Sequence, residues 1–128
     1  MAFQFDLVSP ERRLASVQAT EVQIPAAEGD MTAMEGHTPT ITTLRPGILK
    51  AVAADGIKAF VVTGGFAEIT ATGVSVLAER AVPVEEATPA LMESLLAEVR
   101  VAAAASDDKD AADKAVADMM AARSAIGQ

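Results

Sequence analysis

The sequence predicts an antiparallel β-sandwich or barrel followed by a hairpin of two α-helices. Short runs with alternating apolar and polar residues are separated by turn residues about every 8–12 positions up to Pro83, as in two-sheet antiparallel folds. After Pro83 the chain has almost no β-branched residues and carries apolar residues at helical spacing. No stretch between the predicted strands is long enough for a crossover helix, which argues against a parallel sheet. We therefore expect a β-sandwich domain over residues 1–84 and an α-helical hairpin over residues 85–128.

The first predicted strand is Phe3–Val8, in which apolar and polar residues alternate as in a half-buried strand. Residues 9–11 are expected to form the turn after it. The next strands are predicted at Arg13–Val17 and Glu21–Ile24, and Pro25 is expected to end the second of these.

The segment from Glu28 to Gly47 shows no clear strand before residue 41 and is predicted as a long loop. A loop of this length inside a compact domain is usually functional or disordered. Glu28 and Asp30 are expected at an exposed loop tip, because two acids beside Gly29 have no apolar reason to be buried. We interpret the loop as a docking surface and not as a catalytic site.

Six further strands are predicted after residue 40. Within this region, residues 45–47 have proline and glycine at positions that suit a type II turn. Residues 54–56 predict a three-residue hairpin loop with Gly56 in the left-handed conformation. Gly64 and Gly65 are predicted as a structural turn, where glycine permits a bend or a close approach of two backbones. The strands are Ile41–Leu44, Ile48–Ala53, Ile57–Val62, Phe66–Ala71, Val74–Glu79 and Ala81–Val84.

Capping residues mark the ends of the two predicted helices. Thr88 is expected to cap the first helix, with Pro89 at its first helical position. Residues 106–108 end this helix and cap the next, with acids at the positive end of its dipole. Gly127 is a candidate for the glycine that follows a helix.

The apolar stripes of the two helices differ in what they can bury. The first stripe is rich in Leu and Met, and the second consists mostly of Ala, which buries little apolar area. Because two short helices alone are marginally stable, the hairpin is expected to need a third surface, either its own sandwich or a partner. Ion pairs are expected on the exposed side of the second helix between Lys109 and Asp113 and between Asp110 and Lys114. The stripes are Leu91, Met92, Leu95, Leu96, Val99 and Ala102, then Ala112, Ala115, Val116, Met119, Ala122 and Ile126.

Composition excludes several classes of function. The net charge is -8, and residues 85–128 carry nine acidic and four basic residues, so nucleic acid and anionic lipid are unfavourable partners. No apolar run approaches the roughly 20 residues of a membrane helix, and no secretory leader is recognised, so direct lipid insertion is not expected. The absence of cysteine excludes disulfides, thiolate metal sites and a cysteine nucleophile.

Few residues offer catalytic or ligand-binding chemistry. His37, near Glu35 and Asp30, could belong to a metal or acid–base cluster, but the spacing matches no ligand motif. The simpler interpretation is a turn histidine whose ring hydrogen-bonds to the backbone. The Gly64-Gly65 pair lacks the residues of a phosphate-binding loop. We therefore expect no catalytic residue, metal site or cofactor.

Six short motifs occur in an order that is specific as a set. Through these motifs and their order, the chain resembles the epsilon subunit of F-type ATP synthase, whose mitochondrial counterpart is called delta. The resemblance is close over residues 3–84 and looser over the hairpin. The motifs are FDLVSPER at 5–12, EGD at 28–30, GHTP at 36–39, LRPG at 44–47, GGFAEI at 64–69 and VLAE at 76–79.

The resemblance implies an antiparallel β-sandwich of about ten strands followed by two helices. It implies a non-catalytic subunit of the central rotor stalk, which links the gamma subunit to the c-ring of the membrane sector and couples proton flow to ATP synthesis. Glu28, Gly29 and Asp30, with Met31 beside them, would face the c-ring, where the acids suit a partner loop carrying arginine. Gly36, His37 and Pro39 would lie in the adjoining turn.

The hairpin departs from the family in two respects. Some bacterial members bind ATP through a helical motif with two residues between Asp and Arg, whereas Asp118 and Arg123 here are separated by four, so no ATP binding is expected. The hairpin of inhibitory members is basic and meets the alpha/beta catalytic head. Here the second helix and its cap carry five aspartates, so only weak regulation is expected.

Three hypotheses about the function are consistent with the sequence. The first is the rotor subunit, at the cytoplasmic face of the bacterial inner membrane and peripheral to it. The second is a free-standing β-sandwich protein-binding module that oligomerises through its hairpin. The third is a minimal enzyme or nucleotide sensor built on the loop around His37.

Overall fold

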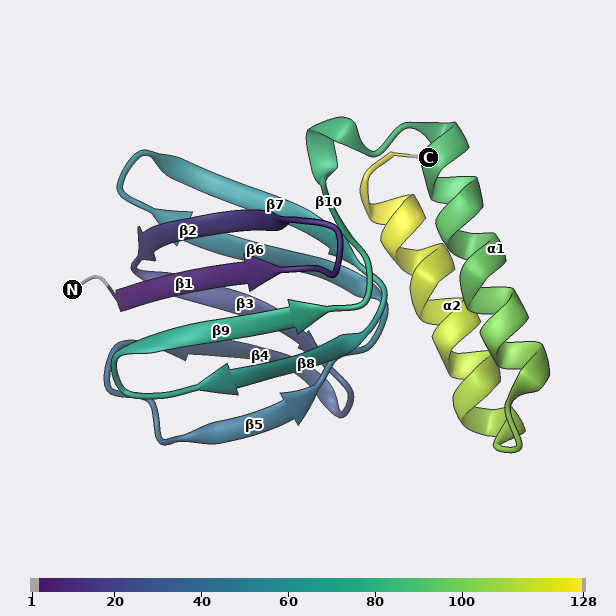
Figure 1. Cartoon of the computed structure of the whole chain (residues 1–128), viewed down its shortest axis with the longest axis horizontal. Helices are drawn as coiled ribbons and strands as arrows, with labels where there is room; N and C mark the ends of the chain where they lie inside the picture. The colour runs from purple at the N-terminus through teal and green to yellow at the C-terminus, as the bar shows by residue number, and fades with distance from the viewer. Residues whose placement is uncertain (1–2, 128) are drawn as a thin grey trace.

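The computed structural model describes residues 3–127, which form ten strands followed by a short 3-10 helix and two α-helices (Figure 1). The strands are β1 (Phe3–Val8), β2 (Arg13–Ala19), β3 (Glu21–Ala26), β4 (Gly29–Met34), β5 (Thr40–Thr43), β6 (Gly47–Ala53), β7 (Gly56–Val62), β8 (Gly65–Ile69), β9 (Gly73–Ala78) and β10 (Ala81–Pro83). The helices are η1 (Val84–Glu86), α1 (Pro89–Ala105) and α2 (Lys109–Ala125).

The ten strands form two five-stranded sheets that pack face to face. Sheet A has the strand order β2-β1-β9-β8-β5, and sheet B has the order β10-β7-β6-β3-β4. Figure 1 shows the two helices side by side at one end of this sandwich. The predicted fold class, a β-sandwich followed by a helical hairpin, is confirmed.

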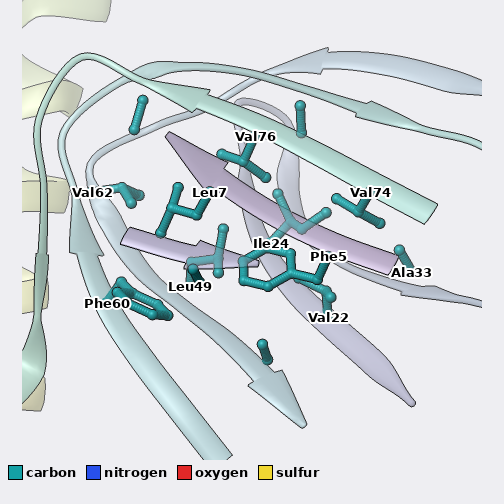
Figure 2. Close-up of a cluster of buried hydrophobic side chains, with 14 of the residues drawn as sticks. Phe5, Leu7, Val22, Ile24, Ala33, Leu49, Phe60, Val62, Val74 and Val76 are labelled. Atoms are coloured by element: carbon teal, nitrogen blue, oxygen red, sulfur yellow. The ribbon is translucent and has the colours of Figure 1, made fainter. Parts of the chain in front are cut away.

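The core between the sheets is built from alternate residues of each strand. In β1 the buried residues are Phe3, Phe5 and Leu7, and the residues between them are only partly buried. Leu49 and Ile24 reach the same core from sheet B, as Figure 2 shows. The core is therefore aliphatic with a few phenylalanines, because the chain has no Tyr or Trp. Its alternation is the pattern from which the strands were predicted.

One strand pair of the sandwich is parallel. β1 runs parallel to β9, from Gln4 opposite Gly73 to Val8 opposite Leu77, whereas the other ladders among the described strands are antiparallel. The expectation of antiparallel pairing throughout is wrong at this pair. Side-chain alternation reports which face of a strand is buried and carries no information about the direction of its neighbour.

The sequence predicted that Pro25 would end β3. Instead, Pro25 is a buried residue within this strand. β3 pairs with β6 only from Glu21 to Gln23, so the ladder on that side has already stopped before Pro25. The Pro25 carbonyl accepts a hydrogen bond of 2.9 Å from the Arg45 backbone N–H. A strand tolerates proline where no ladder hydrogen bond is needed from its nitrogen.

The prediction of a long loop from Glu28 to Gly47 is also wrong, because β4 and β5 occupy much of this segment. β4 is an edge strand in which Ala33 is the only buried residue and Met31 is partly buried. A strand with one exposed face, an open edge and a small inward residue gives a weak alternation signal. The sequence pattern therefore missed β4 and detected β5.

The turn between β6 and β7 is shorter than predicted. Ala53 pairs with Gly56, so the connection consists of Ala54 and Asp55 alone. Gly56 begins β7 with φ at 134°, outside the left-handed helical region expected for it.

The caps of both helices are confirmed. The Thr88 hydroxyl accepts a hydrogen bond of 3.2 Å from the Leu91 N–H, and the Asp108 carboxylate accepts one of 3.1 Å from the Ala111 N–H. Gly127 follows α2 with φ at 86°, as a terminating glycine does. The ion pair on α2 differs from the prediction, because Lys114 bonds Asp118, at 2.7 Å, one turn further along the helix.

The hairpin uses its own sandwich as the third surface it was predicted to need. Met92, Leu95 and Leu96 of α1 are fully buried against Val61 and Val82, which lie on the outer face of sheet B. α2 adds Met119 to the same apolar cluster, and its other buried residues are Ala112 and Ala122. The predicted inequality of the two helices is therefore confirmed, since α1 supplies most of the buried area.

Candidate functional site

The acidic turn, defined here as Glu28, Gly29 and Asp30, lies at the reversal from β3 to β4 and includes the first two residues of β4. Ala26 pairs with Gly29, so the chain reverses tightly, and all three residues of the acidic turn are exposed. The prediction that Glu28 and Asp30 lie at an exposed tip is confirmed. In this position both carboxylates are accessible to a partner.

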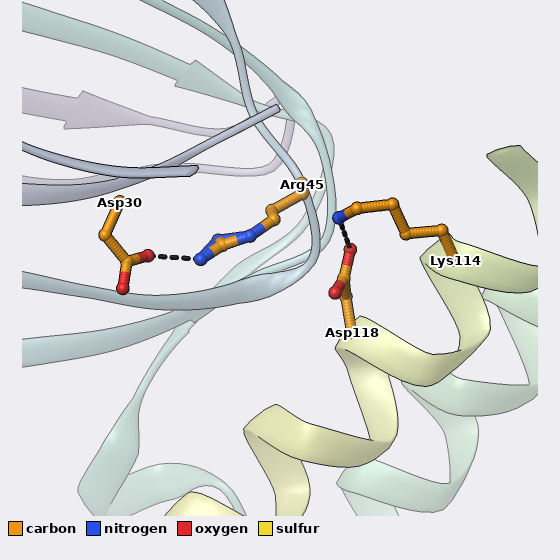
Figure 3. Close-up of polar contacts among 4 residues, drawn as sticks. All are labelled: Asp30, Arg45, Lys114 and Asp118. Atoms are coloured by element: carbon orange, nitrogen blue, oxygen red, sulfur yellow. Dashed lines mark hydrogen bonds and ion pairs between the residues drawn. The ribbon is translucent and has the colours of Figure 1, made fainter. Parts of the chain in front are cut away.

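The two carboxylates of the acidic turn have different surroundings. Asp30 forms an ion pair with Arg45, whose side chain is only 21% exposed, while the Asp30 side chain is 81% exposed. Glu28 takes part in no ion pair among residues 3–127. Figure 3 shows the Asp30–Arg45 pair on the sandwich and the Lys114–Asp118 pair on α2. Among residues 3–127, Glu28 is thus the carboxylate of the turn that has no ion-pair partner.

Met31 is less available than its neighbours in the turn. It is partly buried and packs against the core of the sandwich. It lies on the same face of β4 as the buried Ala33, because side chains two residues apart share a face. The surface that the turn offers to a partner therefore comes from Glu28 and Asp30.

The histidine turn, which contains Gly36, His37 and Pro39, lies at the other end of β4 from the acidic turn. β4 has six residues, of which the first two belong to the acidic turn, and its full length of about 20 Å places the two turns at opposite ends of the strand. The structure therefore does not bring the two turns together at one docking point, although they follow each other in the chain.

The His37 ring contacts the backbone of the next residue, Thr38. Its Nδ1 lies 2.6 Å from the Thr38 carbonyl oxygen, and the His37 N–H donates to the Met34 carbonyl at 3.1 Å. This is the turn histidine that the simpler interpretation predicted. Within residues 3–127, no group of three or more His, Asp or Glu side chains is placed to hold a metal ion.

Gly65 lies where two backbones approach closely. A Cβ at this position would lie 2.0 Å from the Leu77 carbonyl oxygen, and its φ is 113°. At Gly64, an added Cβ would meet the Glu79 carboxylate at 3.0 Å. Gly64 thus lies beside an acidic group, and Gly65 begins β8 at a close approach of two backbones.

An apolar row on the outer face of sheet A was not predicted from the sequence. Val8 and Phe66 lie on either side of Leu77 in neighbouring strands, and these three residues are called the apolar row below. Phe66 is 49% exposed and Leu77 is 46% exposed, and together they line a surface hollow of about 460 Å³ with Pro10. The sequence contains a signal that could have revealed this row. Phe66 in FAEI (66–69) and Leu77 in VSVLA (74–78) are large apolar residues at positions that alternate with the buried ones.

A groove of about 530 Å³ separates α2 from the sandwich beside the acidic turn. Asp30 and Arg45 line it from the sandwich, and Asp118, Ala121 and Ala125 line it from α2. The hairpin therefore borders the acidic turn without covering it.

Comparison with known proteins identifies the family. The sequence profile of the ATP synthase delta/epsilon chain β-sandwich domain matches residues 2–84. The chain belongs to the ATP synthase delta/epsilon family. This epsilon-type chain is 69% identical over 124 residues to the ATP synthase epsilon chain of Fuscovulum blasticum, covering 97% of this chain and 95% of the relative. It is 61% identical over 126 residues to the epsilon chain of Cereibacter sphaeroides, with coverage of 97% and 96%.

Solved structures extend the epsilon-type assignment to three dimensions. A structure of the Euglena gracilis mitochondrial ATP synthase contains a chain with a TM-score of 0.73 and 26% identity, covering 98% of this chain and 81% of that one. A Tetrahymena thermophila mitochondrial ATP synthase chain has the same fold at a TM-score of 0.58 and 17% identity, covering 70% and 72%. The resemblance found in the sequence is thereby confirmed over both parts of the chain. No helix within residues 3–127 is long and apolar enough to cross a membrane.

Proposed function

We propose that this chain is a non-catalytic subunit of the central rotor stalk of a proton-translocating ATP synthase. It links the gamma subunit to the c-ring, couples proton flow to ATP synthesis, and sits peripherally at the cytoplasmic face of a bacterial inner membrane. The observation that carries the proposal is similarity to epsilon chains over 97% of the chain. The related Euglena and Tetrahymena structures both include the c-ring, and the Tetrahymena structure is of the central stalk.

The apolar row is the surface we assign to the gamma subunit. The hairpin covers apolar residues of sheet B, whereas Phe66 and Leu77 on sheet A remain about half exposed. Ile41, 72% exposed, lies on the neighbouring edge strand. Contiguous apolar surface on a small protein marks an interaction site more often than isolated residues do.

The acidic turn is the surface we assign to the polar loops of the c-ring. It is a tight, exposed reversal with one carboxylate that forms no ion pair within the described part of the chain, which suits a partner arginine. Because the histidine turn lies at the opposite end of β4, we assign the c-ring contact to Glu28, Gly29 and Asp30 and not to Gly36, His37 or Pro39.

For the hairpin we propose only a weak regulatory role at the alpha/beta catalytic head. It lies against the sandwich in this structure, held by the apolar cluster around Leu95 and Leu96. Residues 107–118 carry five aspartates, which would be repelled by an acidic partner segment. Asp118 and Arg123 lie five positions apart on α2, and we propose no ATP site there.

The alternative of a free-standing module that oligomerises through its hairpin predicts an apolar hairpin surface free for another copy. The buried apolar residues of α1 instead pack on the chain's own sheet B, which favours the rotor assignment. The reading as an enzyme or nucleotide sensor built on His37 predicts turnover or ATP binding that disappears in His37→Ala. The contact of the His37 ring with the Thr38 backbone carbonyl gives that hypothesis no support.

A pull-down with the gamma subunit tests the proposal. The wild-type chain is expected to retain gamma, and Phe66→Glu with Leu77→Glu is expected to weaken binding at least about 100-fold, because two charges would be buried against apolar surface. Ile57→Glu is the matched control, since Ile57 is similarly exposed but lies on β7 of the other sheet. Failure of the wild-type chain to bind gamma would contradict the rotor assignment, and equal loss in Ile57→Glu would contradict the assigned surface.

A further inference from the structure

Two arginines of the sandwich form ion pairs with two glutamates of the segment that follows it. Arg12 bonds Glu86 of η1 at 3.1 Å, and Arg80 bonds Glu98 of α1 at 2.8 Å. Both parts of the chain are acidic, with nine acidic and six basic residues in 1–84 and nine acidic and four basic residues in 85–128. Two parts with net charges of the same sign repel each other. The two arginines offset this repulsion, because each places a positive charge next to an acidic residue of the segment after the sandwich.

Arg80 is the more constrained of the two arginines. Its Nε lies 3.7 Å from a Glu11 carboxylate oxygen while its Nη1 bonds Glu98, so it bridges the β1–β2 turn and α1. The side chain is 32% exposed. Its backbone is fixed as well, because the Arg80 carbonyl accepts from the Thr63 N–H at 3.2 Å. The guanidinium is therefore held in place from both sides.

Arg80 contacts α1 where the apolar packing ends. Val99, next to Glu98, is the last buried residue of α1. Beyond it, the outer part of the hairpin is separated from the sandwich by a hollow of about 660 Å³, lined by alanines such as Ala103 and Ala111 and by Pro46 and Gly64. The outer hairpin, residues 98–115, thus faces the sandwich across this hollow, with Val99 and Ala112 as its buried residues. The Glu98–Arg80 ion pair is a polar contact that joins it directly to the sandwich.

We propose that Arg80 is an electrostatic clamp that sets how tightly the outer hairpin is held against the sandwich, and that salt loosens this clamp. An exposed ion pair contributes little by itself, but one partly buried arginine between two carboxylates forms a network of the kind that does contribute. The clamp belongs to the isolated chain and does not depend on the proposed role in the rotor.

Amide hydrogen exchange of the full-length chain tests the clamp. Arg80→Gln is expected to speed exchange in the outer hairpin about threefold or more, while the amides of β1 and β9 stay unchanged. Raising ionic strength from about 0.01 M to about 1 M should speed the same amides in the wild type and have little further effect in Arg80→Gln.

Two further variants separate the clamp from a general effect of charge. Arg100→Gln removes the same charge from α1, where Arg100 is exposed and has no ion-pair partner within residues 3–127, and should leave exchange unchanged. Glu98→Gln keeps the Arg80–Glu11 contact and lowers the net negative charge, so simple repulsion predicts slower exchange whereas the clamp predicts faster exchange. Equal exchange in Arg80→Gln and Arg100→Gln, or slower exchange in Glu98→Gln, would overturn the proposal.

Discussion

At the scale of single residues, Gly65 shows how a short motif can be required by backbone geometry. Its φ of 113° and the nearby Leu77 carbonyl leave no room for a side chain. Gly47 is constrained in a similar way, because an added Cβ would lie 2.8 Å from the Pro25 Cβ. The proline inside β3 and the glycine that begins β6 therefore depend on each other.

Gly65→Ala is expected to lower the free energy of unfolding by about 3 kcal/mol or more, or to prevent folding, since it combines an unfavourable φ with a steric clash. Gly36→Ala is the control, because Gly36 also has a positive φ, of 83°, but no atom lies within 4 Å of its added Cβ. That change should cost about 1 kcal/mol. Urea denaturation measures the unfolding free energy of both variants. Equal losses of stability would show that the close backbone approach at Gly65 does not add to the cost of the substitution.

At the scale of turns and strands, the sequence predicted the tip of the acidic turn but not the strand that leads away from it. Glu28-Gly29-Asp30 is recognisable because acids flank a glycine. β4 is not, because Ala33 is its one buried residue and none of the described strands pairs with its outer edge. Because β4 was not predicted, the acidic turn and the histidine turn were assigned to one loop. Their separation by the length of a strand could therefore not be predicted.

Glu28→Lys with Asp30→Lys is expected to weaken the coupling of ATP hydrolysis to proton pumping in inverted vesicles at least about twofold, because it would place positive charge opposite the arginine proposed for the partner loop. Glu35→Lys with Asp55→Lys is the control, since it makes the same charge change in the turns after β4 and after β6. If both double variants couple equally well, the acidic turn is not the contact with the c-ring.

At the scale of the whole molecule, the attachment of the hairpin to the outer face of sheet B joins the two parts. The sequence predicted the helices, their caps and their unequal faces, because these are local patterns. It could not predict that Val61 and Val82, at outward positions of β7 and β10, are covered by α1. It also missed the parallel neighbour of β1, since both features depend on residues far apart in the chain.

A chain ending at Glu86 is expected to lose about 2–4 kcal/mol of unfolding free energy, because Val61 and Val82 become exposed to water. Denaturation of the shortened and full chains, together with binding of a dye specific for apolar surface, measures the effect. Leu95→Ala in the full chain is the control, and it should show the loss of packing with little dye binding. A shortened chain as stable as the full one would mean that the hairpin contributes no packing energy to the sandwich.

The pairing of β1 between β2 and β9 has a consequence for biosynthesis. β2 follows β1 at once, but β9 comes about 70 residues later, and at ribosomal speeds of about 5–20 residues per second that interval lasts several seconds. Throughout it, the nascent chain carries one open edge of β1, together with the apolar faces of Phe5 and Leu7. An open edge of this kind pairs readily with other chains. That edge closes only when β9, which ends at Ala78, has left the ribosome, so the nascent chain exposes an aggregation-prone edge throughout this interval.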